Sequence, residues 1–153
     1  MSRLSAGILL FRRRNHTIEV LLLHPGGPLW SSKDSWTIPK GEIEPDEDII
    51  TAAQREFHEE VGIPAPAGDL IDLGTEKQSP VKINHIWGLE GDLDISKFGS
   101  NEFTMEWPPH SGKIGSFPEC DRAAWFSLKT AEHKLFASQR GFLHTLSLKI
   151  GEI

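Results

Sequence analysis

Between Pro45 and Gly62 the chain runs for sixteen residues without Gly or Pro, which predicts a helix over residues 46–61. The acidic residues at the beginning of this segment suit the positive end of a helix dipole. Apolar residues recur every four positions and form one stripe, at Ile49, Ala53, Phe57 and Val61. A helix with one apolar face must bury that face, and the strand-like segments around it offer a sheet. The segment therefore predicts an α/β fold.

Four other segments have the composition of β-strands: 6–11, 18–24, 81–94 and 122–128. The polar residues between the first two predict an antiparallel pair joined by a turn. The next stretch, HPGGPLW, predicts a loop because two prolines flank two glycines, and SWTIPKGE then predicts a short strand that stops at Pro39. This order of elements predicts a mixed β-sheet sandwiched by helices.

The connection over residues 100–121 is rich in Gly, Pro and Ser and is long for a compact domain. Long connections are often functional, and the aromatic residues in this one favour that interpretation over disorder. From Thr130 to Lys149 the apolar residues are spaced for an amphipathic helix, with a break or kink near Gly141.

Composition limits the class of protein. The chain has 153 residues, 38% hydrophobic and 25% charged, which suits one globular domain over residues 1–153. A formal net charge of -6 disfavours general binding to nucleic acid or to an acidic membrane. The run at 6–11 is far too short to cross a bilayer, so we expect a cytoplasmic protein with no membrane partner. The single cysteine, Cys120, cannot form an internal disulfide, and we expect a structural thiol.

Three carboxylates gather on one face of the predicted helix. Residues three and four positions apart share a helix face, so Glu56, Glu59 and Glu60 project together. Each like-charged pair costs roughly 0.2–0.5 kcal/mol. A solvated acidic surface is one interpretation of this cluster. The other is a divalent cation site, because carboxylates are hard oxygen ligands suited to Mg²⁺ or Mn²⁺, ions that also bind substrate phosphates.

The spacing around these carboxylates resembles a known signature, GX5EX7REUXEEXGU, in which U is an aliphatic or aromatic residue. Every fixed position is filled, by Gly41, Glu47, Arg55, Glu56, Phe57, Glu59, Glu60, Gly62 and Ile63. The chain is thereby identified as a member of the Nudix, or MutT-like, hydrolases. The resemblance implies a Nudix-type α/β/α sandwich that binds Mg²⁺ or Mn²⁺. It also implies hydrolysis of a nucleoside diphosphate linked to another group.

The resemblance assigns roles to single residues. It implies four metal ligands, namely Glu56, Glu59, Glu60 and the carbonyl group of Gly41. Arg55 would orient the glutamates, with Glu47 as its ion-pair partner about two turns earlier. Gly41 and Gly62 would supply backbone freedom where the chain enters and leaves the helix.

The resemblance leaves the general base open. Glu59 is the first candidate, since it could take a proton from a metal-bound water. In several similar subgroups a glutamate outside the signature acts as the base or as a further ligand. Three glutamates in residues 100–121 could do so, and we favour Glu106 over Glu102 and Glu119. The alternative is that all three are surface charges.

The dipeptide Pro39-Lys40 before Gly41 resembles the PKG sequence of asymmetric diadenosine tetraphosphate hydrolases. Lysine suits a polyphosphate, since it offers a point charge to a polyanion. The chain has no tyrosine to stack a base, so aromatic residues of another kind would have to do so: Trp107, Phe103, Trp87 or Trp36. A role in the core is the alternative for each. The stretches HPGGPLW and EWPPHSGK also resemble a bacterial branch of predicted NTP pyrophosphohydrolases.

Several further predictions concern the substrate. Loop residues that could reach its phosphates are His24, Lys82, His110 and Lys113. A nucleoside triphosphate or a dinucleoside polyphosphate such as Ap4A is favoured, while ADP-ribose and nucleotide sugars remain open. Inositol pyrophosphates and capped RNA fit the acidic composition less well. A nucleotide sensor without turnover is the alternative of another class, and the chain could be a monomer or a homodimer.

Overall fold

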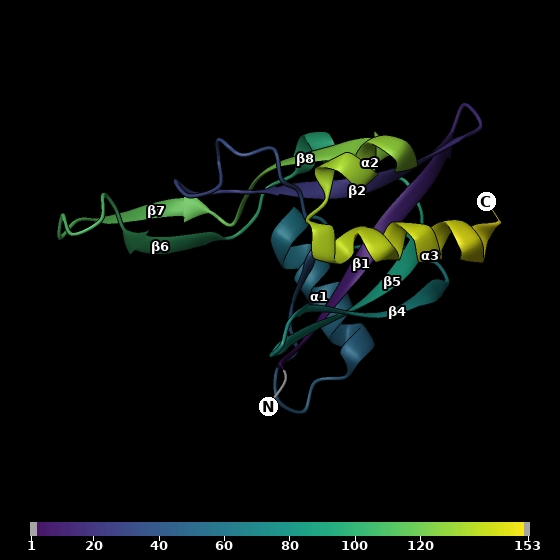
Figure 1. Cartoon of the computed structure of the whole chain (residues 1–153), viewed down its shortest axis with the longest axis horizontal. Coiled ribbons are helices and arrows are strands. Elements are labelled where there is room, and N and C mark those ends of the chain that lie inside the picture. Colours follow the sequence, from purple (N-terminus) through teal and green to yellow (C-terminus); the bar gives the residue numbers. More distant parts are fainter. Residues whose placement is uncertain (1–2, 152–153) are drawn as a thin grey trace.

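The computed structural model describes residues 3–151. Its main element is a six-stranded mixed sheet (Figure 1), made of β1 (Arg3–Arg14), β2 (Thr17–Pro25), β3 (Lys40–Glu42), β4 (Leu70–Ser79), β5 (Lys82–Glu90) and β8 (Cys120–Ser127). The order across the sheet is β4-β5-β1-β2-β8, and β3 pairs with the first half of β1. Strands β1 and β5 are parallel, and the other paired strands are antiparallel. The predicted mixed sheet is confirmed.

Strands β1 and β2 form the predicted antiparallel pair. The turn between them consists of Asn15 and His16, which both have positive φ angles, as tight hairpin turns require. Strand β1 continues past its apolar run as far as Arg14, because β2 pairs with it there. The guanidinium of Arg12 also lies 4.1 Å from the ring centroid of Trp125, so a charged side chain is accommodated on the sheet.

The short strand near Pro39 lies later than predicted. It begins at Lys40 instead of stopping at Pro39, because residues 40–42 pair with residues 5–7 of β1. The Pro39 carbonyl accepts a hydrogen bond from the Ile8 amide just before this pairing starts. Before Pro39, Thr37 forms only an isolated bridge, with Leu23.

Helix α1 (Ile49–Val61) confirms the predicted helix, although it begins three residues later. The carboxylate of Asp48 accepts a hydrogen bond from the Thr51 amide and caps the first turn. Gly62 ends the helix in the left-handed conformation, with a φ of 81°. The apolar stripe packs on the sheet, and Ala53, Phe57 and Val61 are fully buried there.

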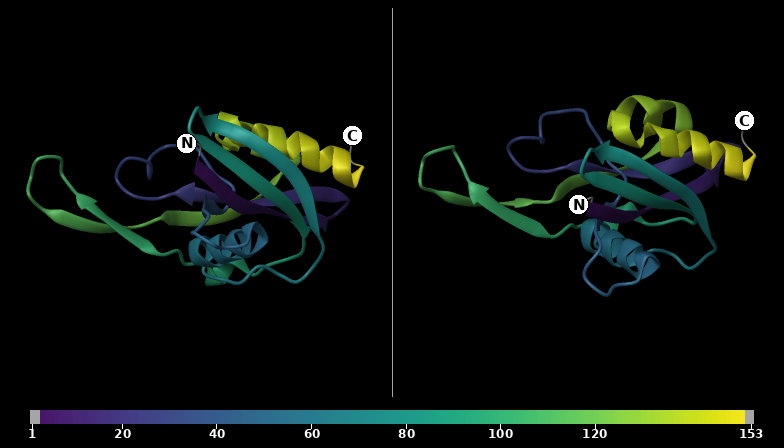
Figure 2. Two further views of the ribbon diagram at one scale, coloured as in Figure 1. Left: turned by 90° about the horizontal axis from the view of Figure 1, so that it is seen from below. Right: turned by 60° about the horizontal axis from the view of Figure 1, so that its bottom comes forward.

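The other face of the sheet is covered by α2 (Leu128–Lys134), η2 (Ala137–Gln139) and α3 (Arg140–Ile150). A terminal helix with a break near Gly141 is predicted, and the position of that break is wrong. The chain leaves the helix at Leu135 and Phe136, because the backbone there bonds to Trp36. Gly141 lies inside α3. Figures 1 and 2 show α1 on one side of the sheet and α3 on the other, which is the predicted sandwich.

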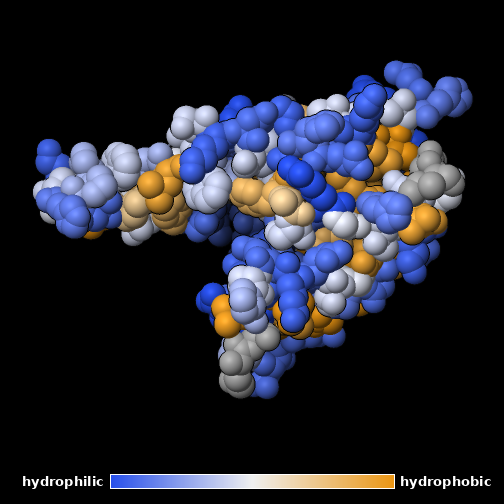
Figure 3. All heavy atoms as spheres, viewed as in Figure 1, coloured by the Kyte–Doolittle hydropathy of each residue, from blue (hydrophilic) through white to orange (hydrophobic). Residues whose placement is uncertain are grey.

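The predicted long loop contains an arm instead. Strands β6 (Glu102–Glu106) and β7 (Ile114–Pro118) form a separate two-stranded ribbon, hereafter the arm, after the short η1 (Ile95–Lys97). The arm projects well beyond the body in both ribbon views (Figures 1 and 2). Its surface is hydrophilic at the tip and carries one apolar patch partway along (Figure 3). Within residues 3–151, no helix is long and apolar enough to cross a membrane.

Candidate active site

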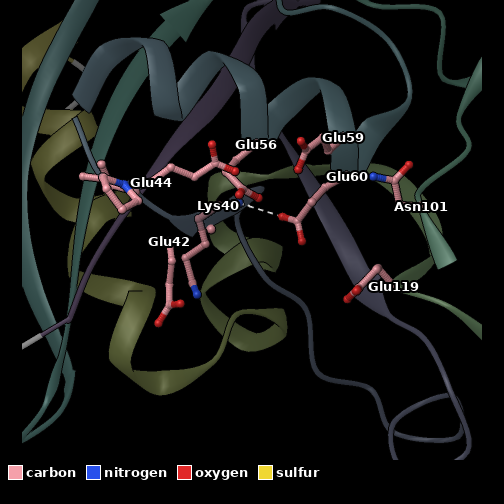
Figure 4. Close-up of a pocket in the computed structure, with 11 residues that line it drawn as sticks. Lys40, Glu42, Glu44, Glu56, Glu59, Glu60, Asn101 and Glu119 are labelled. Carbon is pink, nitrogen blue, oxygen red and sulfur yellow. Dashed lines mark hydrogen bonds between the residues drawn. The ribbon is translucent and has the colours of Figure 1, made fainter. Parts of the chain in front are cut away.

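The acidic face of α1 borders a cavity of about 680 Å³. Three parts of the chain line it: strand β3 with the loop that follows, the acidic face of α1, and the two residues at the base of the arm. The lining residues are Lys40, Gly41, Glu42, Ile43, Glu44, Pro45, Glu56, Glu59, Glu60, Asn101 and Glu119. Figure 4 shows Glu56, Glu59 and Glu60 extending from α1 toward this cavity, with Glu119 across from them.

Gly41 lies directly under α1. A Cβ atom at this position would overlap the carboxylate of Glu56. The φ angle of Gly41 is not positive, whereas that of Gly62 is. The prediction of backbone freedom therefore holds for Gly62 but is wrong for Gly41, where the requirement is space for a carboxylate.

Arg55 organises the carboxylates around it. Its Nε and Nη2 atoms donate to the carboxylate of Glu47, at 2.7 and 2.9 Å, which confirms the predicted ion pair. Its Nη1 atom donates to Glu56 at 2.8 Å and to Glu59 at 3.2 Å. Hydrogen bonds from Arg55 lower the pKa of Glu47 to about 2, and those of the carboxylates raise the pKa of Arg55. The guanidinium thus holds two of the predicted metal ligands by a fixed positive charge.

The buried carboxylate of Glu60 has fewer stabilising hydrogen bonds than the carboxylate of Glu47. Burial raises its pKa to about 8, and the nearby Glu56 adds to that shift. Its carboxylate accepts a hydrogen bond from the backbone amide of Lys40, at 2.7 Å, which opposes the shift. Burial also raises the pKa of Glu56, although Arg55 opposes it. The cavity therefore carries acidic groups whose charges favour a cation.

These side chains fit a divalent metal ion in their chemistry. All are hard oxygen donors, and burial raises the pKa values of Glu56 and Glu60, so a bound cation would stabilise their charged forms. Within residues 3–151, no three acidic, His or Cys side chains are already gathered as a ligand set. The physical reason is visible in the contacts: Arg55 holds Glu56 and Glu59, while Glu60 bonds to Lys40.

Lys40 lines this cavity, and its backbone and side chain lie toward different faces of the sheet. Its backbone bonds to Glu60, but its side chain extends away from α1, as does that of Glu42 (Figure 4). The strand register explains this, since Gly41 lies between them and faces α1. Burial lowers the pKa of Lys40, and repulsion by Lys82, the other predicted phosphate ligand on this face of the sheet, lowers it further.

Glu106 does not reach the cavity, and the preference for it over Glu119 needs correction. Its carboxylate accepts hydrogen bonds from the backbone amides of His110 and Gly112, at 3.0 and 3.2 Å, and so caps the turn of the arm. Glu119 lies at the base of the arm and lines the cavity. The strand pairing of β6 and β7 carries the middle of this segment outward and leaves only its ends at the site.

His24 and Trp107 also lie elsewhere. The ring of His24 is fully buried, and it contacts Asp121 at 2.7 Å through Nδ1 and the Lys33 carbonyl through Nε2. Both nitrogens are thus engaged within the protein, and His24 is not available to a phosphate. Trp107 lies at the outer end of the arm, where its amide bonds to the carbonyl of Lys113. His110 and Lys113 lie in the turn of the arm as well.

The other aromatic candidates differ in exposure. Trp36 and Trp87 are each 6% exposed and belong to the two core layers, which leaves little surface for a base. Phe103 lies at the inner end of the arm, close to Gly27. Cys120, for which a structural thiol is predicted, is buried, and burial raises the pKa of its thiol.

The sequence did not predict five of the lining residues, namely Glu42, Ile43, Glu44, Pro45 and Asn101, and Asn101 is the most distant of them along the chain. Its backbone N–H donates a hydrogen bond to the backbone carbonyl of Glu59, at 3.3 Å. Its backbone carbonyl accepts a hydrogen bond from the backbone N–H of Glu119, at 2.8 Å. It therefore ties the end of α1 to the base of the arm. A single Asn at the start of a polar segment gives no signal of this position, because only the folded arm brings it to the cavity.

A family model described as NUDIX domain matches residues 1–146, and the chain belongs to this family. Hydrolases of the family generally use divalent metal ions. Of the signature residues, Gly41, Glu56, Glu59 and Glu60 line the cavity under α1.

This chain is similar in sequence to curated proteins and in fold to solved structures, of which two relatives and one structure are described. The asymmetrical bis(5'-nucleosyl)-tetraphosphatase of Sus scrofa is 39% identical over 78 residues, which cover 47% of this chain and 50% of that protein. The m7GpppN-mRNA hydrolase NUDT17 of Bos taurus is 31% identical over 108 residues, which cover 64% of this chain and 35% of that protein. The chain thus spans half or less of the length of these curated relatives. A crystal structure of a C. elegans Ap4A hydrolase binary complex matches 99% of both chains with a TM-score of 0.69; at 23% identity it shows the shared fold.

Proposed function

We propose that this protein hydrolyses a phosphoanhydride bond of a nucleoside polyphosphate with the help of Mg²⁺ or Mn²⁺. Dinucleoside polyphosphates such as Ap4A are the preferred substrate class. One observation carries the proposal: Lys40 bonds through its backbone to Glu60 under α1, while its side chain lies on the opposite face of the sheet, which also carries Lys82. A metal-binding end and a phosphate-binding end of one site therefore meet at a single residue.

The residues of this chain have separate roles in the proposal. Glu56, Glu59 and Glu60 would hold the metal, with the Gly41 carbonyl as a further ligand. The ion neutralises phosphate charge and acidifies a bound water when it is present. Arg55 positions Glu56 and Glu59 through its hydrogen bonds, and Glu47 in turn holds Arg55.

The proton from the attacking water needs a carboxylate within reach. Glu59 remains the first candidate, because 43% of its side chain is exposed and it lines the cavity. Glu119 takes the place of Glu106 as the second candidate, since it faces the same cavity from the base of the arm. Lys40 and Lys82 would bind the phosphate groups that do not react, as two positive charges suit a polyanion.

The test is metal-dependent product release from a panel of Ap4A, nucleoside triphosphates, ADP-ribose, a nucleotide sugar and an m7GpppN cap analogue. We expect Ap4A to give ATP and AMP with the highest kcat/KM, and no reaction in EDTA. The variants Glu59→Gln and Glu60→Gln should lose most of this activity, whereas Glu132→Gln on α2, away from the cavity, should keep it.

Each other result has a definite meaning. Faster reaction of ADP-ribose or of the cap analogue would contradict the substrate class but not the metal site. Tight nucleotide binding without any product would contradict hydrolysis and favour the sensor alternative.

A further inference from the structure

A row of polar side chains crosses the sheet on the face opposite α1. The strand registers pair Glu42 with Ser5, Ser5 with Asn84, and Asn84 with Glu76, on β3, β1, β5 and β4 in turn. Side chains of paired residues share a face, and every second residue of a strand does too. Ser5 is therefore on the same face as Leu9, which lies in the apolar layer under α3. The polar row borders the apolar layer on this face.

Two members of this row are buried without partners. Ser5 and Asn84 are both 0% exposed, yet the Ser5 Oγ and Asn84 Oδ1 atoms make no hydrogen bond. The other amide atom of Asn84 donates to Gln78 Oε1, at 3.2 Å. Unpaired buried polar atoms destabilise a folded protein and are few in native structures. Alanine and leucine would fill these positions without that cost, so the two polar side chains need another explanation.

The surroundings of the row connect it to the proposed active site. Lys40 lies two residues from Glu42 on β3, and Lys82 lies two residues from Asn84 on β5, so both lysines are on the face of the row. Figure 4 shows the side chains of Lys40 and Glu42 pointing away from α1. Gln78, an exposed side chain, lies over Asn84 through its hydrogen bond. A flexible, exposed side chain is thus hydrogen-bonded to the amide group that carries one of the two unpaired atoms.

We propose that Ser5 and Asn84 form a nucleoside subsite that accepts a hydrogen bond from a ribose hydroxyl or a base amino group once Gln78 turns away. This inference rests on the proposed function, which it deepens. Asn84 Oδ1 can only accept, and ionised phosphate oxygens cannot donate. The partner of Asn84 Oδ1 is therefore not the phosphate chain, which Lys40 and Lys82 would bind beside the row. The subsite makes the enzyme selective for the nucleoside end of its substrate.

The experiment compares Ser5→Ala and Asn84→Leu with the wild-type protein on Ap4A and three analogues. Two analogues lack the 2′ or the 3′ hydroxyl of ribose, and the third carries hypoxanthine, which lacks the amino group of adenine. We expect each variant to raise KM for Ap4A about five- to tenfold, with kcat within about twofold. The analogue that lacks the donor should show a raised KM with the wild type and no further rise with the variants. The identity of that analogue distinguishes ribose from base.

Stability gives a second readout that a structural role would not produce. Because the Ser5 hydroxyl is unpaired in the free protein, Ser5→Ala should leave Tm unchanged or raise it, while it weakens substrate binding. Ser147→Ala is the matched control: Ser147 is also buried, but its hydroxyl donates to the Leu143 carbonyl at 3.1 Å. That variant should lower Tm and leave KM unchanged.

Binding of the same compounds is also measured by calorimetry, so that the subsite is tested without turnover. Binding that discriminates the analogues but yields no product would overturn the proposed function and support the subsite. Hydrolysis with equal effects of Ser5→Ala on all four compounds, or with none, would overturn the subsite and leave the function in place. Absence of both binding and hydrolysis would overturn both.

Discussion

Glu119 and Glu106 are thirteen positions apart in one polar segment, yet the fold gives them different surroundings. Glu119 lines the cavity and is the second candidate for the general base after Glu59, so we expect Glu119→Gln to lower kcat, by about 100-fold or more where Glu119 is the base. Glu106→Gln should change kcat less than about twofold, because its carboxylate caps the turn of the arm. Steady-state kinetics with saturating Mg²⁺ would measure both. Equal losses in the two variants would contradict the placement of these residues.

At the residue level, the sequence predicted the signature residues well and the remaining site residues poorly. The contacts of Glu56, Glu59 and Arg55 follow from spacing along one helix, which is local information. The surroundings of Glu119 and Asn101 depend on the pairing of β6 with β7, in a segment whose Gly, Pro and Ser content predicts a long connection. Long-range pairing is not encoded in any short window, so the choice among the three glutamates could not be made from spacing.

At the level of elements, strand β3 and helix α1 meet at one glycine. A methyl group at Gly41 would overlap the Glu56 carboxylate, the flexible end of a side chain, so we expect Gly41→Ala to change stability by less than about 1 kcal/mol. The displaced carboxylate should lower activity by about 10- to 100-fold, as loss of ligand orientation commonly does. Thermal unfolding and metal-titrated kinetics would separate the two effects. A large loss of stability would instead mean that the backbone of β3 moves.

Strand β4 shows why some elements escaped sequence analysis. Its sequence, LIDLGTEKQS, contains several polar residues and a glycine. It has no long alternation of apolar and polar residues, so it does not predict a strand. It forms because β5 pairs with it, and a register shift after Asp72 accommodates the irregular part. The predicted terminal helix is interrupted at Leu135 for a similar reason, because the backbone there forms hydrogen bonds with Trp36. In each case a tertiary partner decides the outcome.

For the molecule as a whole, Glu60 links stability to pH and metal. Its pKa is raised from 4.5 to about 8, so between these values the folded state keeps a proton that the unfolded state releases. Stability of the metal-free protein should therefore fall as pH rises from 4.5 through 8. Thermal unfolding in EDTA at pH 5, 6, 7 and 8 would measure this slope.

The control for this prediction is Glu60→Gln, which should show a flatter dependence of Tm on pH over the same range. Excess Mg²⁺ should raise the Tm of the wild type most at pH 8, because the ion binds the ionised carboxylates and not the unfolded chain. A wild-type Tm that rises with pH relative to the variant would contradict the raised pKa of Glu60.

The arm begins after Asn101 and ends before Glu119, whose backbones are already joined by a hydrogen bond of 2.8 Å. Everything beyond that bond is, topologically, an insertion closed at its own neck. Evolution could lengthen, shorten or replace it without changing the sheet, the metal helix or the two residues at the neck. The active site of this protein and its arm can therefore change independently of each other during evolution, and at different rates.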